Sequence, residues 1–217
     1  MADLFSNNNN IILPVQGYKD KFYVNNVYCV GRNYINHAKE MGADDRTPPF
    51  FFSKPNWTVS PSGSIITFPK DTDNLNYEAE LVIAVGEDQS IFGFGVGVDL
   101  TRRDIQAKAK EEGKPWFRGK CFQGSASVSN IIPINDRKVF DDLSLSLSVN
   151  GEVKQSGFCK DMIWNVGEIM CELSREIPLN GGDLIFTGTP EGVGKLTKGD
   201  NVVAAIPGLI ELSFHIS

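Results

Sequence analysis

The chain has 217 residues, 41% of them hydrophobic, which is enough for one sizeable core, and no shift in composition marks a boundary between two domains. The formal net charge of -6 argues against nucleic acid or an anionic membrane as the main partner, because neither attracts an acidic protein. A small anionic substrate is compatible with this charge if it meets a local cationic site. No apolar run approaches the roughly 20 residues that a membrane span requires.

Cysteine usage and the first residues bear on the cellular compartment. The four cysteines are scattered without a C-x-x-C pair: Cys29, Cys121, Cys159 and Cys171. The opening MADLFSNNNN has neither the basic region nor the apolar core of a secretion signal. We therefore expect free thiols and a cytoplasmic protein, with residues 1–26 forming a peripheral segment.

The first stretch that suggests chemistry is GRNYINHAKEMG, which begins at Gly31 after a predicted short strand of residues 27–30. Asn33 is placed to cap a brief helix. His37 and Glu40 lie three residues apart, so on a helix they share a face, and Glu40 can orient the imidazole as a general base requires. An exposed polar pair is the alternative at this spacing.

Prolines break the next segment into short pieces. Phe50 to Phe52 is predicted to be a short buried strand with Lys54 just beyond it, and residues 65–68 form another strand. A turn-rich loop then leads into the most unusual part of the sequence.

Asn76 to Val85, NYEAELVIAV, places two carboxylates inside an apolar, strand-like run. Residues two apart in a strand project from the same side, so Glu78 and Glu80 share a face, with their carboxylates about 7 Å apart. Two like charges in an enclosed site need a proton or a cation between them, and a hard divalent metal would supply that charge. The alternative is an exposed face on which both glutamates are solvated.

The next predicted strand, Ile91 to Leu100, alternates apolar side chains with glycines and has Asp99 near its end. The glycines are Gly93, Gly95 and Gly97. A row of glycines in a strand marks close approach by another backbone or a ligand, and a tightly packed barrel corner is a further explanation. The face that carries them ends in a third carboxylate.

The run LTRRDIQAKAKEEGKP that follows is predicted to be a helix, with Thr101 and Asp104 related as in a capping box. Arg103 and Gln106 are one turn apart on this helix. Both side chains can therefore face the same pocket as Asp99.

Two loops carry polar groups suited to an anion. Lys120, in the Gly- and aromatic-bounded loop PWFRGKCF, can meet an anion, although a lone lysine is usually a solvated charge. A predicted strand of residues 184–186 enters TGTPEGVGKL, in which backbone N–H groups and the hydroxyl of Thr189 are free to contact a carboxylate. A plain connecting turn is the alternative for this loop.

The rest of the second half has ordinary patterns. The alternating run LSLSLSVN predicts a β-hairpin that turns at Asn150-Gly151. Apolar residues at helical spacing predict a helix from Asp161 to Leu173 that packs on the core.

Five motifs, taken together and in this order, resemble those of the fumarylacetoacetate hydrolase family: GRNYINHAKEMG, the E-x-E of Glu78 and Glu80, DLTRRDIQ from Asp99, PWFRGKCF with Lys120, and TGTPEGVG. The resemblance runs from about Val27 to the C-terminus. It is closest to small single-domain members that act as acylpyruvate hydrolases, oxaloacetate decarboxylases or oxaloacetate tautomerases. One departure lies in GKCFQGSASVSN, where Cys121 and Gln123 replace residues more usual in relatives, which bears on the pocket rim and on the substrate.

The resemblance implies an α+β fold, a β-rich roll or sandwich of mixed strands with a few short helices. In it, residues 27–217 form a single catalytic domain, and the protein is a homodimer. The implied metal ligands are Glu78, Glu80 and Asp99. The implied catalytic groups are His37 and Glu40 on a mobile lid helix, together with Lys120. The implied substrate contacts are Arg103, Gln106, Lys120 and Thr189.

Three carboxylates and water make an all-oxygen site, which suits Mg²⁺ or Mn²⁺ and, with more ligands, Ca²⁺; we expect Mg²⁺. The resemblance then implies an enzyme that acts on short 2-oxo and 2,4-dioxo acids through a metal-bound enolate. The reaction is C–C bond hydrolysis of acylpyruvates, decarboxylation of oxaloacetate, or both. The alternative at the same site is keto–enol isomerisation, by an oxaloacetate tautomerase or a hydroxymuconate-type isomerase.

Two other classes of protein are alternatives to this one. A non-haem iron oxygenase needs two histidines and one carboxylate, whereas the chain has only His37 and His215 beside three acidic candidates. A non-catalytic metal-binding β module could contain the same strands. Such a module has no evident need for the pair His37 and Glu40 near a carboxylate cluster.

Overall fold

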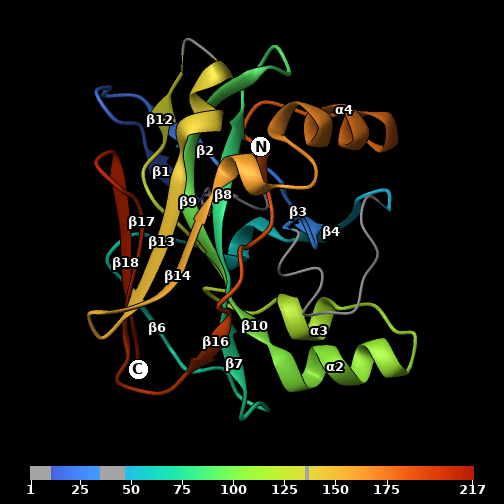
Figure 1. Cartoon of the computed structure of the whole chain (residues 1–217), viewed down its shortest axis with the longest axis vertical. Helices are drawn as coiled ribbons and strands as arrows, with labels where there is room; N and C mark the ends of the chain where they lie inside the picture. The colour runs from blue at the N-terminus through green and yellow to red at the C-terminus, as the bar shows by residue number, and fades with distance from the viewer. Residues whose placement is uncertain (1–10, 35–46, 135–136) are drawn as a thin grey trace, which may run out of the picture.

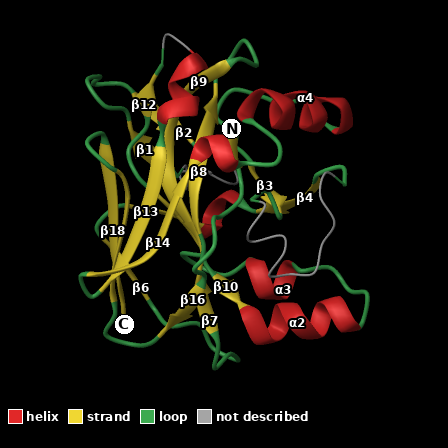
Figure 2. Ribbon diagram, in the orientation of Figure 1, coloured by secondary structure: helices red, strands yellow, loops and turns green. Residues whose placement is uncertain are grey.

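Strands dominate the computed structural model, which describes residues 11–34, 47–134 and 137–217 (Figure 1). In these ranges the strands form four sheets, of eight, five, three and two strands. The helices α2, α3 and α4 lie on one side of the strands, as the colouring by secondary structure shows (Figure 2). The predicted fold class, a β-rich roll of mixed strands with a few short helices, is confirmed.

The largest sheet supplies the scaffold of the molecule. Its strand order is β4-β3-β15-β8-β9-β11-β5, with β12 paired to β9. The β3–β15 and β5–β11 pairs are parallel and the other pairs antiparallel. The bounds are β3 Val27–Gly31, β4 Phe50–Lys54, β5 Val59–Pro61, β8 Ala79–Val85, β9 Ile91–Asp99, β11 Ala126–Val128, β12 Ile132–Pro133 and β15 Leu184–Phe186.

β8 lies at the centre of this sheet, and all seven of its residues are buried. Leu81 and Ile83 contribute to one hydrophobic cluster, whereas Val82 and Ala84 contribute to a second cluster on the other face. A strand that is covered on both faces reads as a continuous apolar run, which explains why this sequence does not alternate.

The glycines of β9 are explained by its neighbours in the protein. A Cβ on Gly93 would lie 2.4 Å from the carbonyl oxygen of Ile132, and one on Gly97 would lie 2.6 Å from a methyl group of Val82. Close approach by another backbone is therefore observed at Gly93, whereas at Gly97 the nearest atoms belong to packed side chains.

A five-stranded sheet packs over one face of the large sheet (Figure 1). Its order is β14-β13-β17-β18-β6, with bounds β6 Ser64–Ile66, β13 Ser144–Val149, β14 Glu152–Phe158, β17 Asn201–Ile206 and β18 Ile210–Ile216. The predicted hairpin of β13 and β14 is confirmed. Asn150 and Gly151 both have positive φ, 52° and 83°, as a two-residue hairpin turn of this kind requires.

Two small sheets complete the strands of the described chain. One joins β10 (Thr101–Arg102), β7 (Leu75–Tyr77) and β16 (Gly194–Leu196), and the other pairs β1 (Ile12–Pro14) with β2 (Lys21–Tyr23). Leu13 and Phe22 of the second sheet are buried in the second hydrophobic cluster.

The helices of the described ranges are short, and two boundaries differ from prediction. The bounds are η1 Asn56–Thr58, α2 Arg103–Glu111, α3 Phe117–Lys120, η2 Arg137–Asp142, η3 Cys159–Asp161 and α4 Val166–Glu176. The helix predicted from Asp161 begins only at Val166, because Asn165 and Glu168 form a capping box there. Met162 is still buried, but from the turn that precedes the helix.

The start of α2 also differs from prediction. Thr101 belongs to β10, and Arg102 occupies the N-cap position without a side-chain cap. Asp104 accepts a hydrogen bond from the hydroxyl of Thr72 instead, at 2.6 Å. The capping-box interpretation of Thr101 and Asp104 was therefore wrong. Among the residues that the structure describes, no helix is long and apolar enough to cross a membrane.

Candidate active site

A break between two strands brings three carboxylates together. β7 ends at Tyr77 and β8 begins at Ala79, so Glu78 lies at the junction of two sheets, with Glu80 one residue inside β8. Asp99 ends the neighbouring strand β9, and its N–H donates to the carbonyl oxygen of Glu78 at 2.8 Å.

Each of the three carboxylates offers an oxygen, and these atoms lie within 4.8 Å of one another. The exposed fractions of the three residues are 6% for Glu78, 2% for Glu80 and 1% for Asp99. The alternative of an exposed, solvated face is therefore excluded, and the separation is smaller than the roughly 7 Å expected from strand geometry.

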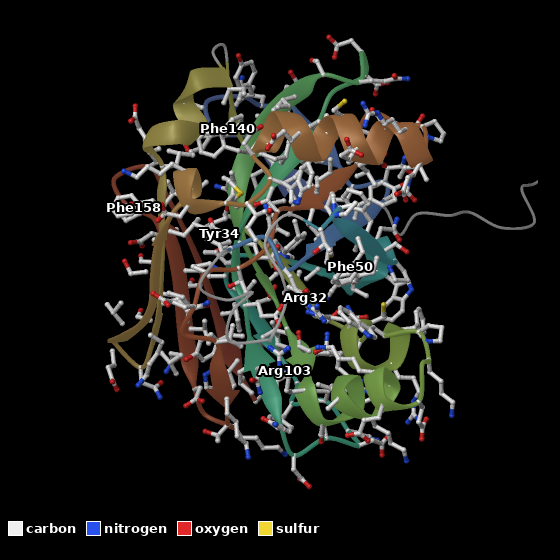
Figure 3. The ribbon with its side chains drawn as sticks, turned by 45° about the vertical axis from the view of Figure 1, so that its right-hand side comes forward. Arg32, Tyr34, Phe50, Arg103, Phe140 and Phe158 are labelled. Carbon is white, nitrogen blue, oxygen red and sulfur yellow. The ribbon has the colours of Figure 1, made fainter. Side chains whose placement is uncertain are left out.

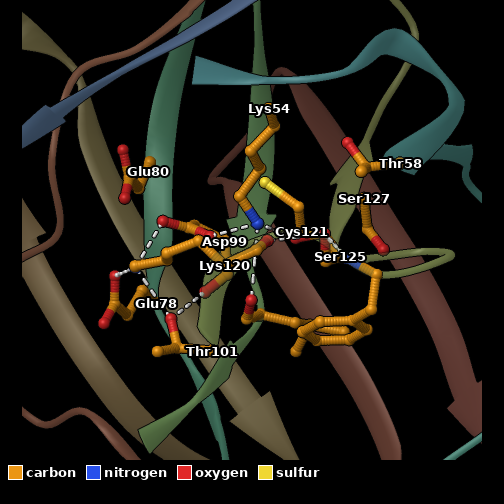
Figure 4. A network of polar contacts seen from close by, with 12 residues as sticks. Lys54, Thr58, Glu78, Glu80, Asp99, Thr101, Lys120, Cys121, Ser125 and Ser127 are labelled. Carbon is orange, nitrogen blue, oxygen red and sulfur yellow. Dashed lines mark hydrogen bonds and ion pairs between the residues drawn. The ribbon is translucent and has the colours of Figure 1, made fainter. Parts of the chain in front are cut away.

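Lys120 lies inside this cluster instead of in solvent. Its Nζ donates to Glu78 Oε2 at 2.8 Å, to Asp99 Oδ2 at 2.6 Å and to the hydroxyl of Thr101 at 2.7 Å (Figure 4). Burial alone would lower the pKa of the Lys120 ammonium, but Asp99 and Glu78 outweigh burial and raise this pKa above its usual value. Lys120 is therefore a fixed positive charge.

A second buried lysine, Lys54, was not predicted as part of the site. Its Nζ lies 2.5 Å from Asp99 Oδ1 and donates to the carbonyl oxygen of Ser125 at 2.7 Å (Figure 4). Because the two groups carry opposite charges at this distance and both side chains are buried, the contact is a buried ion pair. β4 was expected to bury its phenylalanines, but Phe50 is exposed and Lys54 is the buried residue of the strand.

Glu80 contacts the loop that follows β15. The N–H of Gly188 donates to Glu80 Oε2 at 2.6 Å, from a backbone conformation with φ 98° that favours glycine. Burial raises the pKa of Glu80 well above its usual value, and the charges of Asp99 and Glu78 raise it further. A cation added beside the three carboxylates would favour the ionised form of Glu80.

Arg103 and Gln106 are brought together as predicted. Arg103 donates to Glu78 Oε1 at 2.5 Å and to Gln106 Oε1 at 2.8 Å. Gln106 is buried, whereas the Arg103 side chain is 22% exposed, so this guanidinium lies between the carboxylates and the solvent. Figure 3 shows Arg103 and Arg32 on the side of the molecule where α2 and α3 lie against the strands.

Thr189 also borders the site, in the loop that the sequence left open as a plain turn. It is buried, and its hydroxyl accepts a hydrogen bond from Gln155 Nε2 at 2.9 Å. Gln155 comes from β14 in the five-stranded sheet and was not predicted to take part.

These side chains line one recess. Its residues are Val30, Gly31, Arg32, Phe52, Glu78, Glu80, Asp99, Arg103, Gln106, Lys110, Trp116, Lys120, Gly188 and Thr189. The free space inside is about 30 Å³, room for a single ion or water molecule. A larger ligand would require side chains at the rim, such as Arg103 or Lys110, to move outward.

Of the two histidines of the chain, only His215 lies within the described residues. His37 and Glu40 lie outside the described residues, so their predicted pairing stays a prediction. His215 lies on β18, where its Nδ1 is 3.1 Å from Asn201 Oδ1, and it does not line the recess.

The set of donors fits a hard divalent cation. Three buried carboxylates offer only oxygen, and their mutual repulsion is relieved by added positive charge. Mg²⁺ and Mn²⁺ prefer such ligands, whereas softer metals prefer imidazole or thiolate.

Residues 26–217 match the family described as fumarylacetoacetate (FAA) hydrolase C-terminal, and the chain belongs to this family. It is 40% identical to a fumarylpyruvate hydrolase of Ralstonia sp. over 177 residues, which cover 77% of this chain and 92% of that protein. It is 36% identical to the human mitochondrial oxaloacetate tautomerase FAHD1, over 88% of this chain and 91% of that one.

A solved structure gives the corresponding comparison in three dimensions. The crystal structure of fumarylpyruvate hydrolase from Pseudomonas aeruginosa in complex with Mn²⁺ and pyruvate superposes with a TM-score of 0.91 at 41% identity, over 98% of each chain. The named relatives are enzymes, so the chain belongs to a family that includes hydrolases and tautomerases, and the Pseudomonas aeruginosa relative holds Mn²⁺ and pyruvate.

Proposed function

We propose that this protein is a divalent-metal-dependent hydrolase that cleaves a C–C bond of short acylpyruvates. The observation that carries the proposal is the convergence of three buried carboxylates, Glu78, Glu80 and Asp99, within 4.8 Å beside cationic side chains. The similarity to two fumarylpyruvate hydrolases at 40% and 41% identity supports the choice of reaction.

Glu78, Glu80 and Asp99 would hold the cation, with Mg²⁺ expected and Mn²⁺ a close substitute. The cation would supply a Lewis acid that stabilises negative charge on the oxygens of a bound 2-oxo acid. The Mn²⁺ and pyruvate held by the Pseudomonas aeruginosa relative support a divalent cation and a 2-oxo acid as the ligands of this site.

The cationic and polar side chains of the recess would bind the anionic substrate. Arg103 lies at the solvent side of the carboxylates, where it can turn from Glu78 to a substrate carboxylate. Gln106 Oε1 accepts a hydrogen bond from Nη1 of the same guanidinium. Thr189 and Lys120 would complete the polar wall around the substrate.

His37, assisted by Glu40, would act as the general base for hydrolysis. The imidazole takes a proton from water, and the resulting hydroxide adds to the acyl carbon of the substrate. The bond between this carbon and carbon 3 then breaks, and its electron pair stays on carbon 3. Protonation of carbon 3 yields pyruvate, and the acyl group leaves as a carboxylic acid.

Oxaloacetate tautomerisation is the second candidate, favoured by the similarity to human FAHD1 across most of both chains. This reaction moves a proton at carbon 3 and breaks no C–C bond. Decarboxylation of oxaloacetate would use the same recess without attack by water.

A substrate panel tests the proposal. Acetylpyruvate, fumarylpyruvate and oxaloacetate are each incubated with the metal-depleted protein, with Mn²⁺ or Mg²⁺ added, or with excess chelator. We expect metal-dependent release of pyruvate from the two acylpyruvates, and faster enol–keto conversion than pyruvate release from oxaloacetate. Metal binding without turnover of any of the three would instead favour the non-catalytic binding module.

A further inference from the structure

Gln155 lies on a strand whose other side chains are exposed or half-buried. β14 is an edge strand of the five-stranded sheet, and of its seven residues only Gln155 is buried, at 1% exposure. A fully buried amide on such a strand needs partners for both of its ends, because an unpaired buried polar group is destabilising.

Both ends of the Gln155 amide have partners, and these partners belong to the candidate active site. Oε1 accepts from the N–H of Ala79 at 2.9 Å. Ala79 is the residue between Glu78 and Glu80. Nε2 donates to Thr189 Oγ1 at 2.9 Å and to the carbonyl oxygen of Pro190 at 3.0 Å. One side chain thus joins the carboxylate strand to the loop that lines the recess.

The orientation of the amide follows from its surroundings. The side of Gln155 that faces Ala79 meets a donor, whereas the other side meets oxygens only, including the carbonyl of Glu191 at 3.4 Å. A reversed amide would place its oxygen against those oxygens and its N–H₂ against an N–H group.

We propose that Gln155 is a positioning residue that fixes the Thr189 hydroxyl as a hydrogen-bond donor toward the substrate. A hydroxyl has one proton to donate and two lone pairs, and one lone pair of Thr189 Oγ1 accepts from Gln155 Nε2. Among the described residues the Thr189 hydroxyl donates to no acceptor, and Thr189 lines the recess, so its proton can point into the recess, where an anionic oxygen of a 2-oxo acid would accept it. This inference rests on the proposed function.

The same contacts tie the loop to Glu80. Gly188, next to Thr189, donates its N–H to Glu80 Oε2, so the loop that Gln155 holds also holds one carboxylate of the cluster. The contact with Glu80 is made by the backbone N–H of Gly188 and not by the side chain of Gln155. We therefore expect substitutions of Gln155 to weaken substrate binding more than metal binding.

The test compares Gln155→Met, Thr189→Val and the double variant. The methionine side chain in Gln155→Met has a similar volume but cannot replace the hydrogen bonds of the amide. We expect it to raise KM for acetylpyruvate about 10-fold, the loss of one hydrogen bond to a charged group, with kcat reduced less than about 3-fold. In the Thr189→Val background the same substitution should raise KM by no more than about 2-fold, because the hydroxyl through which Gln155 acts is gone.

Gln155→Glu gives a second, directional readout. Its carboxylate can still accept from Ala79 but would also accept the proton of Thr189, which turns this proton away from the substrate. KM should therefore rise more than in Gln155→Met. The matched control is Leu147→Val, which alters the residue paired with Gln155 on β13, and it should leave KM unchanged.

Mn²⁺ titrations and melting temperatures accompany the kinetics. A dissociation constant for Mn²⁺ within about 3-fold of wild type in Gln155→Met is the expected result. An unchanged KM in Gln155→Met, independent effects in the double variant, or an equal rise of KM in Leu147→Val would overturn the inference while the wild-type reaction stands. Failure of the wild type to turn over or bind any 2-oxo acid would reject the proposed function and this inference with it.

Discussion

Glu80 is the carboxylate of the site with the fewest compensating contacts. Within the described ranges Glu78 pairs with Lys120 and Arg103, and Asp99 pairs with both buried lysines. Glu80 forms no ion pair in the same ranges and accepts one backbone hydrogen bond, from Gly188. Its ionised form therefore depends most strongly on an added cation.

This difference predicts the effect of Glu80→Gln in two conditions. Without metal, the substitution removes a buried carboxyl group whose ionised form is poorly compensated, while an amide oxygen can still accept from Gly188. The melting temperature should therefore stay the same or rise, by about 2–4 °C for each kcal/mol gained. With Mn²⁺ in excess, the variant should show no further rise. A large loss of stability without metal would contradict this account of Glu80.

The cysteines give a second prediction at this scale. Burial raises the pKa of Cys159 to about 12 and that of Cys29 well above its usual value, and it also raises the pKa of Cys121. A thiol whose pKa lies far above 8 is almost wholly protonated and unreactive at pH 8. Cys171 is exposed.

We expect one thiol per native chain to react quickly with Ellman's reagent at pH 8, and four after denaturation. Cys171→Ser should remove the fast reaction. Two or more fast thiols in the native protein would contradict the burial of the other cysteines.

At the scale of elements, local sequence patterns predicted the parts of the site that lie on one element. Glu78 and Glu80 were found because charges interrupt an apolar run, and Arg103 and Gln106 because they are one helical turn apart. Asp99 was found as the carboxylate at the end of the glycine row. These patterns depend on neighbours in the sequence, so they are visible without the fold.

The residues that the sequence did not indicate are brought in by long-range pairing. Lys54 ends β4 and Asp99 ends β9, which three other strands separate in the order of the large sheet. Gln155 comes from a hairpin of the five-stranded sheet and reaches Thr189 in the loop after β15. Neither pairing leaves a local signal. The start of α4 is different, because the Asn165 and Glu168 spacing of a capping box was present in the sequence, while Met162 and Ile163 extended the apolar pattern too early.

The cap of α4 gives a prediction for one element. Asn165 accepts from the N–H of Glu168 at 3.0 Å, and the Glu168 carboxylate accepts from the N–H of Asn165 at 2.9 Å. Asn165→Ala should lower the free energy of unfolding by about 1 kcal/mol, whereas Asn165→Ser should change it by a few tenths. Denaturant unfolding measures both. Since α4 does not line the recess, metal affinity should be the same in both variants.

At the scale of the whole molecule, the candidate site lies where three sheets meet. Glu80 and Asp99 come from the large sheet, Thr101 from the three-stranded sheet and Gln155 from the five-stranded sheet. A metal ion bound at this junction would connect strands of different sheets, which separate when the protein unfolds. Metal binding should therefore stabilise the whole protein.

The corresponding prediction concerns thermal unfolding. A cation that binds only the folded state adds about 2.7 kcal/mol of stability at 100 times its dissociation constant. Mn²⁺ or Mg²⁺ should raise the melting temperature, excess chelator should reverse the rise, and Glu78→Ala should abolish it. A metal-induced shift of normal size in Glu78→Ala would show that this carboxylate is not a ligand.

Two expectations for the whole chain stay predictions. One is the homodimer, for which light scattering should give about twice the chain mass of 23.9 kDa. The other is the division into a peripheral segment, residues 1–26, and a catalytic domain, residues 27–217.

The most direct test of the central claim is to follow metal occupancy and reaction rate in the same samples. Mn²⁺ is titrated into the metal-depleted protein, bound Mn²⁺ is counted by electron paramagnetic resonance, and pyruvate release from acetylpyruvate is measured at each step. The rate should rise in proportion to occupancy and level off at one ion per chain, while Glu80→Gln neither binds Mn²⁺ tightly nor releases pyruvate. Full activity in excess chelator, or one tightly bound Mn²⁺ in Glu80→Gln, would contradict the account.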